Sequence, residues 1–143
     1  MTAPLKRVAI RLPGTSLLNA DAAAWHYGPK FDPQRVEDNH AKFVGLMVQS
    51  DVDVVAMDQE DRGIADAVFT YDASFMTPRG AILMAPGKPL RRTEPNIHRA
   101  FYAAQDIPVI GEISGAARAE AGDTLWLNDN LLVLGRGFRT IDA

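Results

Sequence analysis

Residues 66–72 read Asp-Ala-Val-Phe-Thr-Tyr-Asp, and residues 123–129 read Asp-Thr-Leu-Trp-Leu-Asn-Asp. The two stretches share their terminal aspartates and an aliphatic and an aromatic residue at the same inner positions, at an offset of 57 residues. Val54–Val55 and Val109–Ile110 recur at nearly the same offset. A unit that recurs at this size indicates a repeat architecture, for example a propeller-like one. Two units alone would leave open sheet edges, and a closed ring would need more chain.

Outward from this repeat, the pattern predicts an α/β fold in which strands and helices alternate. A helix is expected over residues 33–49, because Asp32 can cap it and Pro33 suits a first helical position. A second helix is expected over residues 94–105, with Thr93 as its cap. Residues 13–30 are expected to be irregular, and strands are expected at 7–12, 52–57, 67–71, 81–84, 108–113, 124–127 and 131–134, the last two joined by a hairpin turn.

Length and composition narrow the class of protein. A chain of 143 residues suits one domain, 1–143, with no internal boundary. A net charge of −3 without a basic block argues against nucleic acid as a partner. No apolar run is long enough for a membrane helix and no signal-peptide pattern is found, so no membrane contact and a cytoplasmic location are the expectations.

The sequence contains no cysteine, which excludes disulfides, thiolate metal sites and a cysteine nucleophile supplied by these residues. The three histidines show no metal-ligand spacing and are expected to be structural. There is no P-loop, and Gly135-Arg136-Gly137 lacks the third glycine of a dinucleotide loop. No metal and no cofactor are therefore predicted.

Carboxylates are the first candidates for chemistry. Asp66 and Asp72 bracket the expected strand at even spacing, which would place them on one face. They are either turn residues bonded to backbone N–H groups, or a grip for a planar guanidinium or amidinium cation. Glu120 lies just before another expected strand, where it is either part of a turn or a general acid or base. Arg91 and Arg139 are either solvated or anchors for a ligand carboxylate.

Four segments carry a family resemblance, in this order: Phe69-Thr-Tyr-Asp72, Arg79-Gly-Ala-Ile-Leu-Met-Ala-Pro-Gly-Lys-Pro-Leu-Arg-Arg92-x-Glu94, Glu120-x-Gly-Asp123 and Gly135-Arg-Gly-Phe-Arg-Thr140. Together they resemble the guanidino-group-modifying superfamily, the penteins, and within it the dimethylarginine dimethylaminohydrolase-like branch. The resemblance implies a five-bladed α/β propeller of ββαβ units around one central site. The chain would then form the N-terminal half of it, a partial propeller.

The resemblance also implies a chemistry and residue roles. A cysteine thiolate attacks the guanidinium carbon of arginine or a methylated arginine, an amine leaves, and water hydrolyses the thiouronium to citrulline. Asp72 and Glu120 would bind opposite sides of the guanidinium, and Asp66 would bind the α-amino group. Phe69 would pack on the guanidinium or its stem, Arg91 and Arg139 would hold the carboxylate, and a loop around Leu17 would act as a lid.

Departures from the family pattern leave alternatives open. Ala121 stands where the family usually has glycine, Tyr71 replaces a frequent acidic residue, and Ile141 replaces a frequent asparagine. The family's histidine base and cysteine nucleophile belong to the C-terminal half, so a C-terminal half or second polypeptide is the expected partner. The alternatives are an amidinotransferase, a non-catalytic binding or assembly module that forms a homo-oligomer, and a generic α/β domain.

Overall fold

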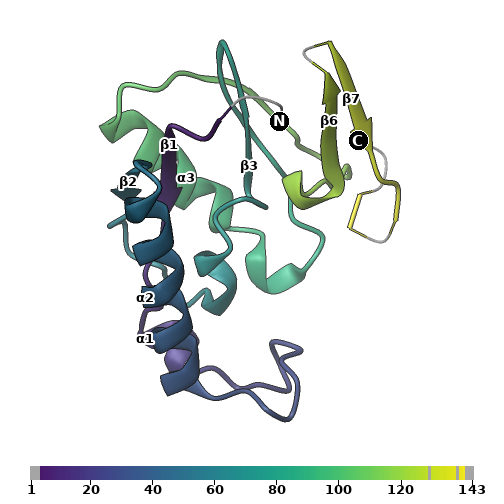
Figure 1. Cartoon of the computed structure of the whole chain (residues 1–143). Coiled ribbons are helices and arrows are strands. Elements are labelled where there is room, and N and C mark those ends of the chain that lie inside the picture. The colour runs from purple at the N-terminus through teal and green to yellow at the C-terminus, as the bar shows by residue number, and fades with distance from the viewer. Residues whose placement is uncertain (1–3, 129, 138, 141–143) are drawn as a thin grey trace. The chain divides into compact units, whose positions relative to one another are not determined.

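The computed structural model describes residues 4–128, 130–137 and 139–140. Asp129 of the repeat, and Phe138 and Ile141 beside the last motif, lie outside the described residues. The chain forms two compact units, one from Pro4 to Val68 and one from Phe69 onward, and each is described separately below (Figure 1).

The first unit is a small βαβ arrangement. Strands β1 and β2 pair in parallel, and the long helix α2 connects them. The α2 helix starts as predicted, since the Asp32 carboxylate accepts a hydrogen bond from the Arg35 N–H at 3.3 Å and Pro33 occupies the first turn. A four-residue helix, α1, was not predicted. The elements are β1 (Arg7–Ile10), α1 (Thr15–Leu18), α2 (Pro33–Gln49), β2 (Asp53–Ala56) and the 3₁₀ helix η1 (Ala65–Val68).

The second unit contains a three-stranded sheet and a separate hairpin. In the sheet, β3 and β4 are antiparallel, while β4 and β5 are parallel and joined through helix α3. Strands β6 and β7 form the hairpin (Figure 1). The elements are β3 (Ser74–Thr77), β4 (Gly80–Leu83), η2 (Pro89–Arg91), α3 (Glu94–Ala104), β5 (Val109–Glu112), η3 (Ala121–Asp123), β6 (Thr124–Asn128) and β7 (Leu131–Leu134).

The repeat is present as a common order of elements. A strand, a short helix, a long helix, a parallel strand, a 3₁₀ helix and a further strand occur as β1-α1-α2-β2-η1-β3 and again as β4-η2-α3-β5-η3-β6, with the 3₁₀ helix η2 in the place of α1. The α/β class expected from the sequence is confirmed.

The strand predicted at residues 67–71 is wrong. Residues 65–68 form the 3₁₀ helix η1, and a turn follows in which the Asp72 N–H donates to the Phe69 carbonyl at 3.2 Å. Phe69 and Tyr71, whose β propensity favoured a strand, are each 50% exposed, so no buried sheet face holds them. Asp66 and Asp72 therefore do not share a strand face.

Strand β3, which was not predicted, lies just after this turn. Its partner β4 is reached through a tight turn in which the Thr77 hydroxyl donates to the Gly80 carbonyl at 2.8 Å. The core of the second unit lies beneath this sheet, where Phe75 and Met84 pack with Ala119 and Ala121. Trp126 of β6 stacks on Phe75 with 5.6 Å between ring centroids, which attaches the hairpin to the core.

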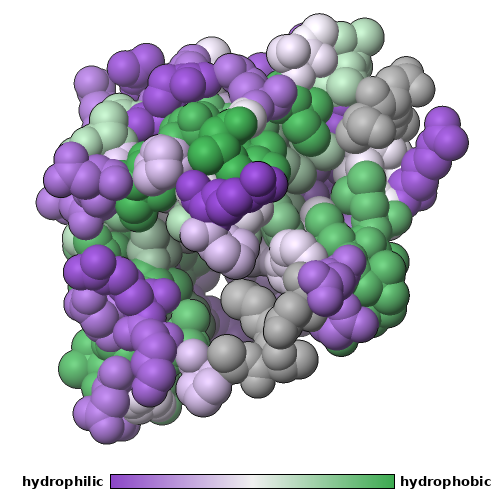
Figure 2. Space-filling view, turned by 90° about the horizontal axis from the view of Figure 1, so that it is seen from above, coloured by the Kyte–Doolittle hydropathy of each residue, from purple (hydrophilic) through white to green (hydrophobic). Residues whose placement is uncertain are grey.

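The opposite face of the hairpin is apolar and exposed. Register places Leu125 opposite Val133, and alternation along β7 puts Leu131 on the same side as Val133, away from Trp126. These three side chains are 44–58% exposed. The space-filling view shows hydrophobic surface on the side that carries this hairpin (Figure 2). We call Leu125, Leu131 and Val133 the outer hairpin face.

Within the described residues, no helix has the length and apolar character needed to cross a bilayer.

Gly80 is expected to tolerate no side chain. Its φ is +138°, and a Cβ there would lie 2.3 Å from the Pro108 carbonyl oxygen. Gly80→Ala should therefore lower the free energy of unfolding by about 2–3 kcal/mol, measured by urea denaturation. Gly111→Ala in β5 is the matched control, because its Cβ would meet only Ile82 at an ordinary 3.8 Å. Equal loss in both variants would contradict the steric explanation.

Candidate functional site

Asp72 lies where the chain enters the second unit's sheet. Its backbone carbonyl accepts a hydrogen bond from the Ala121 N–H at 3.0 Å, which joins two segments that are far apart in sequence. Gly122 allows this approach, because a Cβ at Gly122 would lie 2.5 Å from Asp72 Oδ1. The glycine in the Glu120-x-Gly-Asp123 motif is therefore required for close contact with the Asp72 carboxylate.

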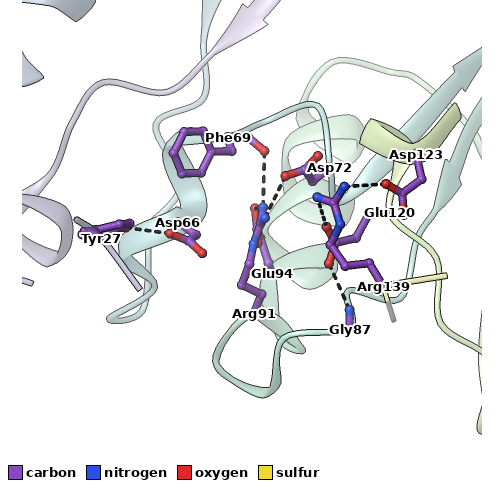
Figure 3. Close-up of polar contacts among 10 residues, drawn as sticks. All are labelled: Tyr27, Asp66, Phe69, Asp72, Gly87, Arg91, Glu94, Glu120, Asp123 and Arg139. Carbon is purple, nitrogen blue, oxygen red and sulfur yellow. Dashed lines mark hydrogen bonds and ion pairs between the residues drawn. The ribbon is translucent and has the colours of Figure 1, made fainter. Parts of the chain in front are cut away.

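Arg91, at the end of η2, links two carboxylates (Figure 3). Its Nη1 donates to Asp72 Oδ2 at 2.8 Å, and its Nε and Nη2 donate to the two oxygens of Glu94 at 2.6 and 2.9 Å. Its Nη2 also contacts the Phe69 carbonyl at 3.5 Å. Arg91 is 5% exposed and Glu94 is fully buried, so the bidentate pair is largely shielded from water.

The charge of Arg91 is fixed by these partners. Burial alone would lower the pKa of its guanidinium, but the hydrogen bonds and negative charges of Glu94 and Asp72 outweigh burial and raise that pKa above its ordinary value. Arg91 is therefore a cation at neutral pH, where it balances part of the charge of Glu94 and Asp72.

Glu120 is held from two sides and is only 2% exposed. Its Oε1 accepts the Gly87 N–H at 3.1 Å, and its Oε2 accepts Arg139 Nη1 at 3.3 Å (Figure 3). Arg139 also donates through Nη2 to Asp123 Oδ1 at 2.5 Å. The Thr140 hydroxyl donates to the other Asp123 oxygen at 2.7 Å.

These contacts form two ion-pair networks in the second unit, which are joined only through the hydrogen bond from the Ala121 N–H to the Asp72 carbonyl, and together we call them the polar cluster. It contains four carboxylates, those of Asp72, Glu94, Glu120 and Asp123, against the guanidinium groups of Arg91 and Arg139. The formal excess is two negative charges, so the cluster can accept a further cation. In the part of the chain that the structure describes, no group of His, Asp and Glu side chains has the arrangement of a metal site.

A buried polar network lies next to this cluster. Ser74 Oγ contacts His98 Nδ1 at 2.8 Å and the Tyr102 hydroxyl at 2.6 Å, and all three residues are buried. His98 is thus a hydrogen-bonded structural histidine, as predicted. Desolvation raises the pKa of the Tyr102 phenol, although its bond to Ser74 opposes the shift. The network fixes α3, which carries Glu94, against β3, which follows Asp72.

Two predicted residues belong to the first unit. Asp66, in η1, is 5% exposed and accepts the Tyr27 hydroxyl at 2.6 Å (Figure 3). Leu17 is buried in α1, which packs against η1. The Asp61 carboxylate holds α1 by accepting the Ser16 hydroxyl at 2.6 Å. The segment predicted as a lid is therefore a short, anchored helix in this structure.

The structure thus brings five predicted residues together in the second unit, Phe69, Asp72, Arg91, Glu120 and Arg139. Sequence reasoning missed the contacts made by Glu94, Asp123 and Tyr27. Glu94 and Asp123 close two of the quoted motifs, so their positions were a usable signal. For Tyr27, in a segment without periodicity, the sequence offered no signal.

No family model matches the chain, but two known proteins are similar to it. The dimethylarginine dimethylaminohydrolase of Pseudomonas aeruginosa is 28% identical over 139 residues, which is 94% of this chain and 52% of that enzyme. The uncharacterized protein YkgA of Bacillus subtilis is 27% identical over 103 residues, 72% of this chain and 35% of that protein. The chain therefore spans about half or less of the length of these relatives.

Solved structures agree with this similarity. A variant of the Pseudomonas aeruginosa dimethylarginine dimethylaminohydrolase with one cysteine replaced by serine, in complex with citrulline, superposes with a TM-score of 0.80 at 26% identity, over 96% of this chain and 52% of that one. The N-terminal domain of the cyanobacterial arginine dihydrolase ArgZ superposes with a TM-score of 0.77 at 19% identity, over 95% of this chain and 51% of that one. This likeness concerns the fold alone.

The buried pair of Arg91 and Glu94 is expected to matter more for stability than an exposed pair of the same type. Glu94→Gln leaves a buried guanidinium with one carboxylate fewer and should lower the free energy of unfolding by about 3 kcal/mol. Glu112→Gln is the control, because Glu112 pairs with Arg99 at 2.6 Å on the surface and its loss should cost about 0.5 kcal/mol. Urea denaturation measures both, and equal losses would contradict the structural reading.

Proposed function

Because the chain belongs to the guanidino-group-modifying (pentein) superfamily and is homologous to dimethylarginine dimethylaminohydrolase, we propose that it forms the substrate-binding portion of a hydrolase acting on arginine or a methylated arginine. The observation that carries this proposal is the polar cluster of the second unit. Its excess of carboxylates suits a cationic guanidinium, whose planar N–H groups match pairs of carboxylate oxygens.

In the proposed complex, Asp72 and Glu120 bind the guanidinium head. Asp72 Oδ2 is already held by Arg91, while Oδ1 lies against Gly122. Fixed carboxylates of this kind orient a planar cation without further loss of conformational entropy. Phe69, half exposed beside this cluster, would cover the apolar stem of the substrate.

The ends of the substrate require other residues. Arg139 is the more accessible arginine, with 41% of its side chain exposed, and we assign it to the substrate carboxylate. Arg91 would take part only by exchanging one of its present partners, so its main proposed role is to hold Asp72. Asp66 is assigned to the α-amino group. The segment at Leu17 could serve as the proposed lid only by releasing the contact between Ser16 and Asp61 that anchors it in this structure.

The reaction requires a cysteine nucleophile and a histidine base. These 143 residues contain no cysteine, and the family's histidine base belongs to the C-terminal half. We propose that both come from polypeptide outside the sequence, either further chain or a second subunit, which together with this portion completes a propeller. The thiolate would attack the guanidinium carbon and the C–N bond would break as the amine leaves with a proton. Water would then attack the thiouronium, break the C–S bond and release citrulline.

Arginine binding by the chain tests the substrate-binding role. Asp72→Asn and Glu120→Gln should each weaken arginine about 10- to 100-fold in calorimetric titrations, because each removes one charge-assisted interaction of about 1.5–3 kcal/mol. Citrulline, which is neutral at the same end, should bind more weakly than arginine to the unmodified chain.

Asp38→Asn is the matched control, since among the described residues the exposed Asp38 side chain in α2 accepts a hydrogen bond only from Gln34, and the substitution removes the same charge. Unchanged arginine binding in Asp72→Asn and Glu120→Gln, with the fold intact by circular dichroism, would contradict the assignment. Citrulline formation by the chain alone would contradict the external nucleophile.

The alternative is a non-catalytic assembly module, and the outer hairpin face is the observation that favours it. Three aliphatic side chains on one side of a two-stranded hairpin leave apolar area that a further layer of protein would bury. In the hydrolase, the polypeptide that supplies the nucleophile would cover this face. In the assembly module, a second copy of the chain would do so.

Light scattering after size-exclusion chromatography distinguishes the hydrolase portion from the assembly module by the oligomeric state of the chain. If the face is self-complementary, the chain should be a dimer, and Leu125→Lys with Val133→Lys should make it a monomer, because burying two ammonium groups opposes association. Lysines at Ala103 and Ala104, which are exposed at the end of helix α3, are the control. A monomeric chain that binds arginine would favour the hydrolase and argue against the module.

A further inference from the structure

A cavity of about 220 Å³ opens beside strand β4 in the second unit. Its lining combines an apolar wall with two arginines and a hydroxyl, and contains no acidic residue: Ala85, Pro86, Arg92, Ile113, Ser114, Gly115 and Arg118. None of these residues belongs to the polar cluster that binds the guanidinium in the proposed function.

The two arginines are positioned differently from those of the polar cluster. Arg92 is exposed at the rim of the cavity, and within the described residues its side chain has no ion-pair or hydrogen-bond partner. Arg118 donates through Nη1 to the carbonyls of Gly115 at 3.0 Å and Ala117 at 2.5 Å, which holds the side chain in place. Its Nε and Nη2 make no contact within the described part of the chain.

Further donors lie in the loop that follows β5. Ser114 and Gly115 are exposed, and the Ser114 hydroxyl and both backbone N–H groups form no hydrogen bond within the described ranges, which leaves them open to a ligand. Gly115 has a φ of +69°, a conformation suited to glycine in which the loop turns at the cavity. An anion would satisfy these N–H donors together with the guanidinium groups.

The size and the lining of the cavity limit which class of ligand can bind there. It is smaller than the roughly 300–1,000 Å³ typical of sites for drug-sized molecules. Pro86 and Ile113 give it an apolar wall that a short methylene chain can contact, whereas two separate arginines match two acidic groups. We propose that this cavity binds a small aliphatic dicarboxylate, with Arg92 and Arg118 as its charged contacts and the Ser114–Gly115 loop as an additional donor.

Nuclear magnetic resonance titration of the isotopically labelled chain with glutarate tests this inference. The amide signals of Ser114 and Gly115 should shift saturably. Arg92→Gln should weaken the affinity about 10-fold, because one charge-assisted contact is lost. Arg118→Lys, which keeps the charge, should weaken it less than Arg118→Gln. Higher salt should weaken binding in each case.

Arg79→Gln is the matched control, since Arg79 is exposed on the β3–β4 turn, does not line the cavity, and its loss changes the net charge equally. Glutaramide, which lacks the charges, should give no shift. Equal weakening by Arg79→Gln and Arg92→Gln, or no saturable shift at all, would overturn the site. Tighter binding of inorganic phosphate than of glutarate would overturn the dicarboxylate assignment.

The readout does not depend on arginine. A chain that fails to bind arginine but binds glutarate at Ser114 and Gly115 would contradict the proposed function while supporting this cavity as a site. The reverse result would reject the cavity and leave the function standing.

Discussion

The organisation of the second unit depends on one buried cation, the guanidinium of Arg91. It is 5% exposed and uses Nε and both terminal nitrogens on Glu94, Asp72 and the Phe69 carbonyl. A buried cation without such partners would cost several kcal/mol. The sequence must therefore bring η2, the first turn of α3 and the loop before β3 together, and this requirement places Asp72. Gly122 then limits where the Asp72 carboxylate can lie, from its other side.

The sequence predicted most of this cluster, but not the way its members use one another. Carboxylates and arginines at the quoted positions indicated a site for a ligand with a cationic and an anionic end. The structure shows the same groups paired internally, with Arg91 on Asp72 and Arg139 on Glu120. Pairing of this kind depends on which segments meet in space, and the hydrogen bond between the Ala121 N–H and the Asp72 carbonyl that joins them has no sequence signal.

The secondary structure, too, was predictable where its signals are local and not where it depends on tertiary contacts. Helix α2 was predictable because its signals are local: Asp32 caps the helix and Pro33 fits its first turn. Residues 66–72 were not, because the β propensity of Val68, Phe69 and Tyr71 favoured a strand while the chain forms η1 and a turn. Strand β3 was missed because its formation depends on pairing with another strand rather than on its own residues. Its stability comes from β4, reached through a turn at Gly80 whose positive φ only glycine adopts easily.

The Glu120 and Asp72 carboxylates are held by hydrogen bonds from different parts of the second unit. Its Oε1 is held by the Gly87 N–H, and Gly87 follows Pro86, which lines the cavity beside β4. Its Oε2 is held by Arg139, which shares Asp123 with the root of the hairpin, where the Gly135 N–H donates to the Asp123 carbonyl at 2.8 Å. Glu120 is therefore held by segments that continue to the cavity and to the root of the hairpin. Asp72 is held by the buried Arg91 instead, so the two carboxylates of the proposed guanidinium site depend on different parts of the unit.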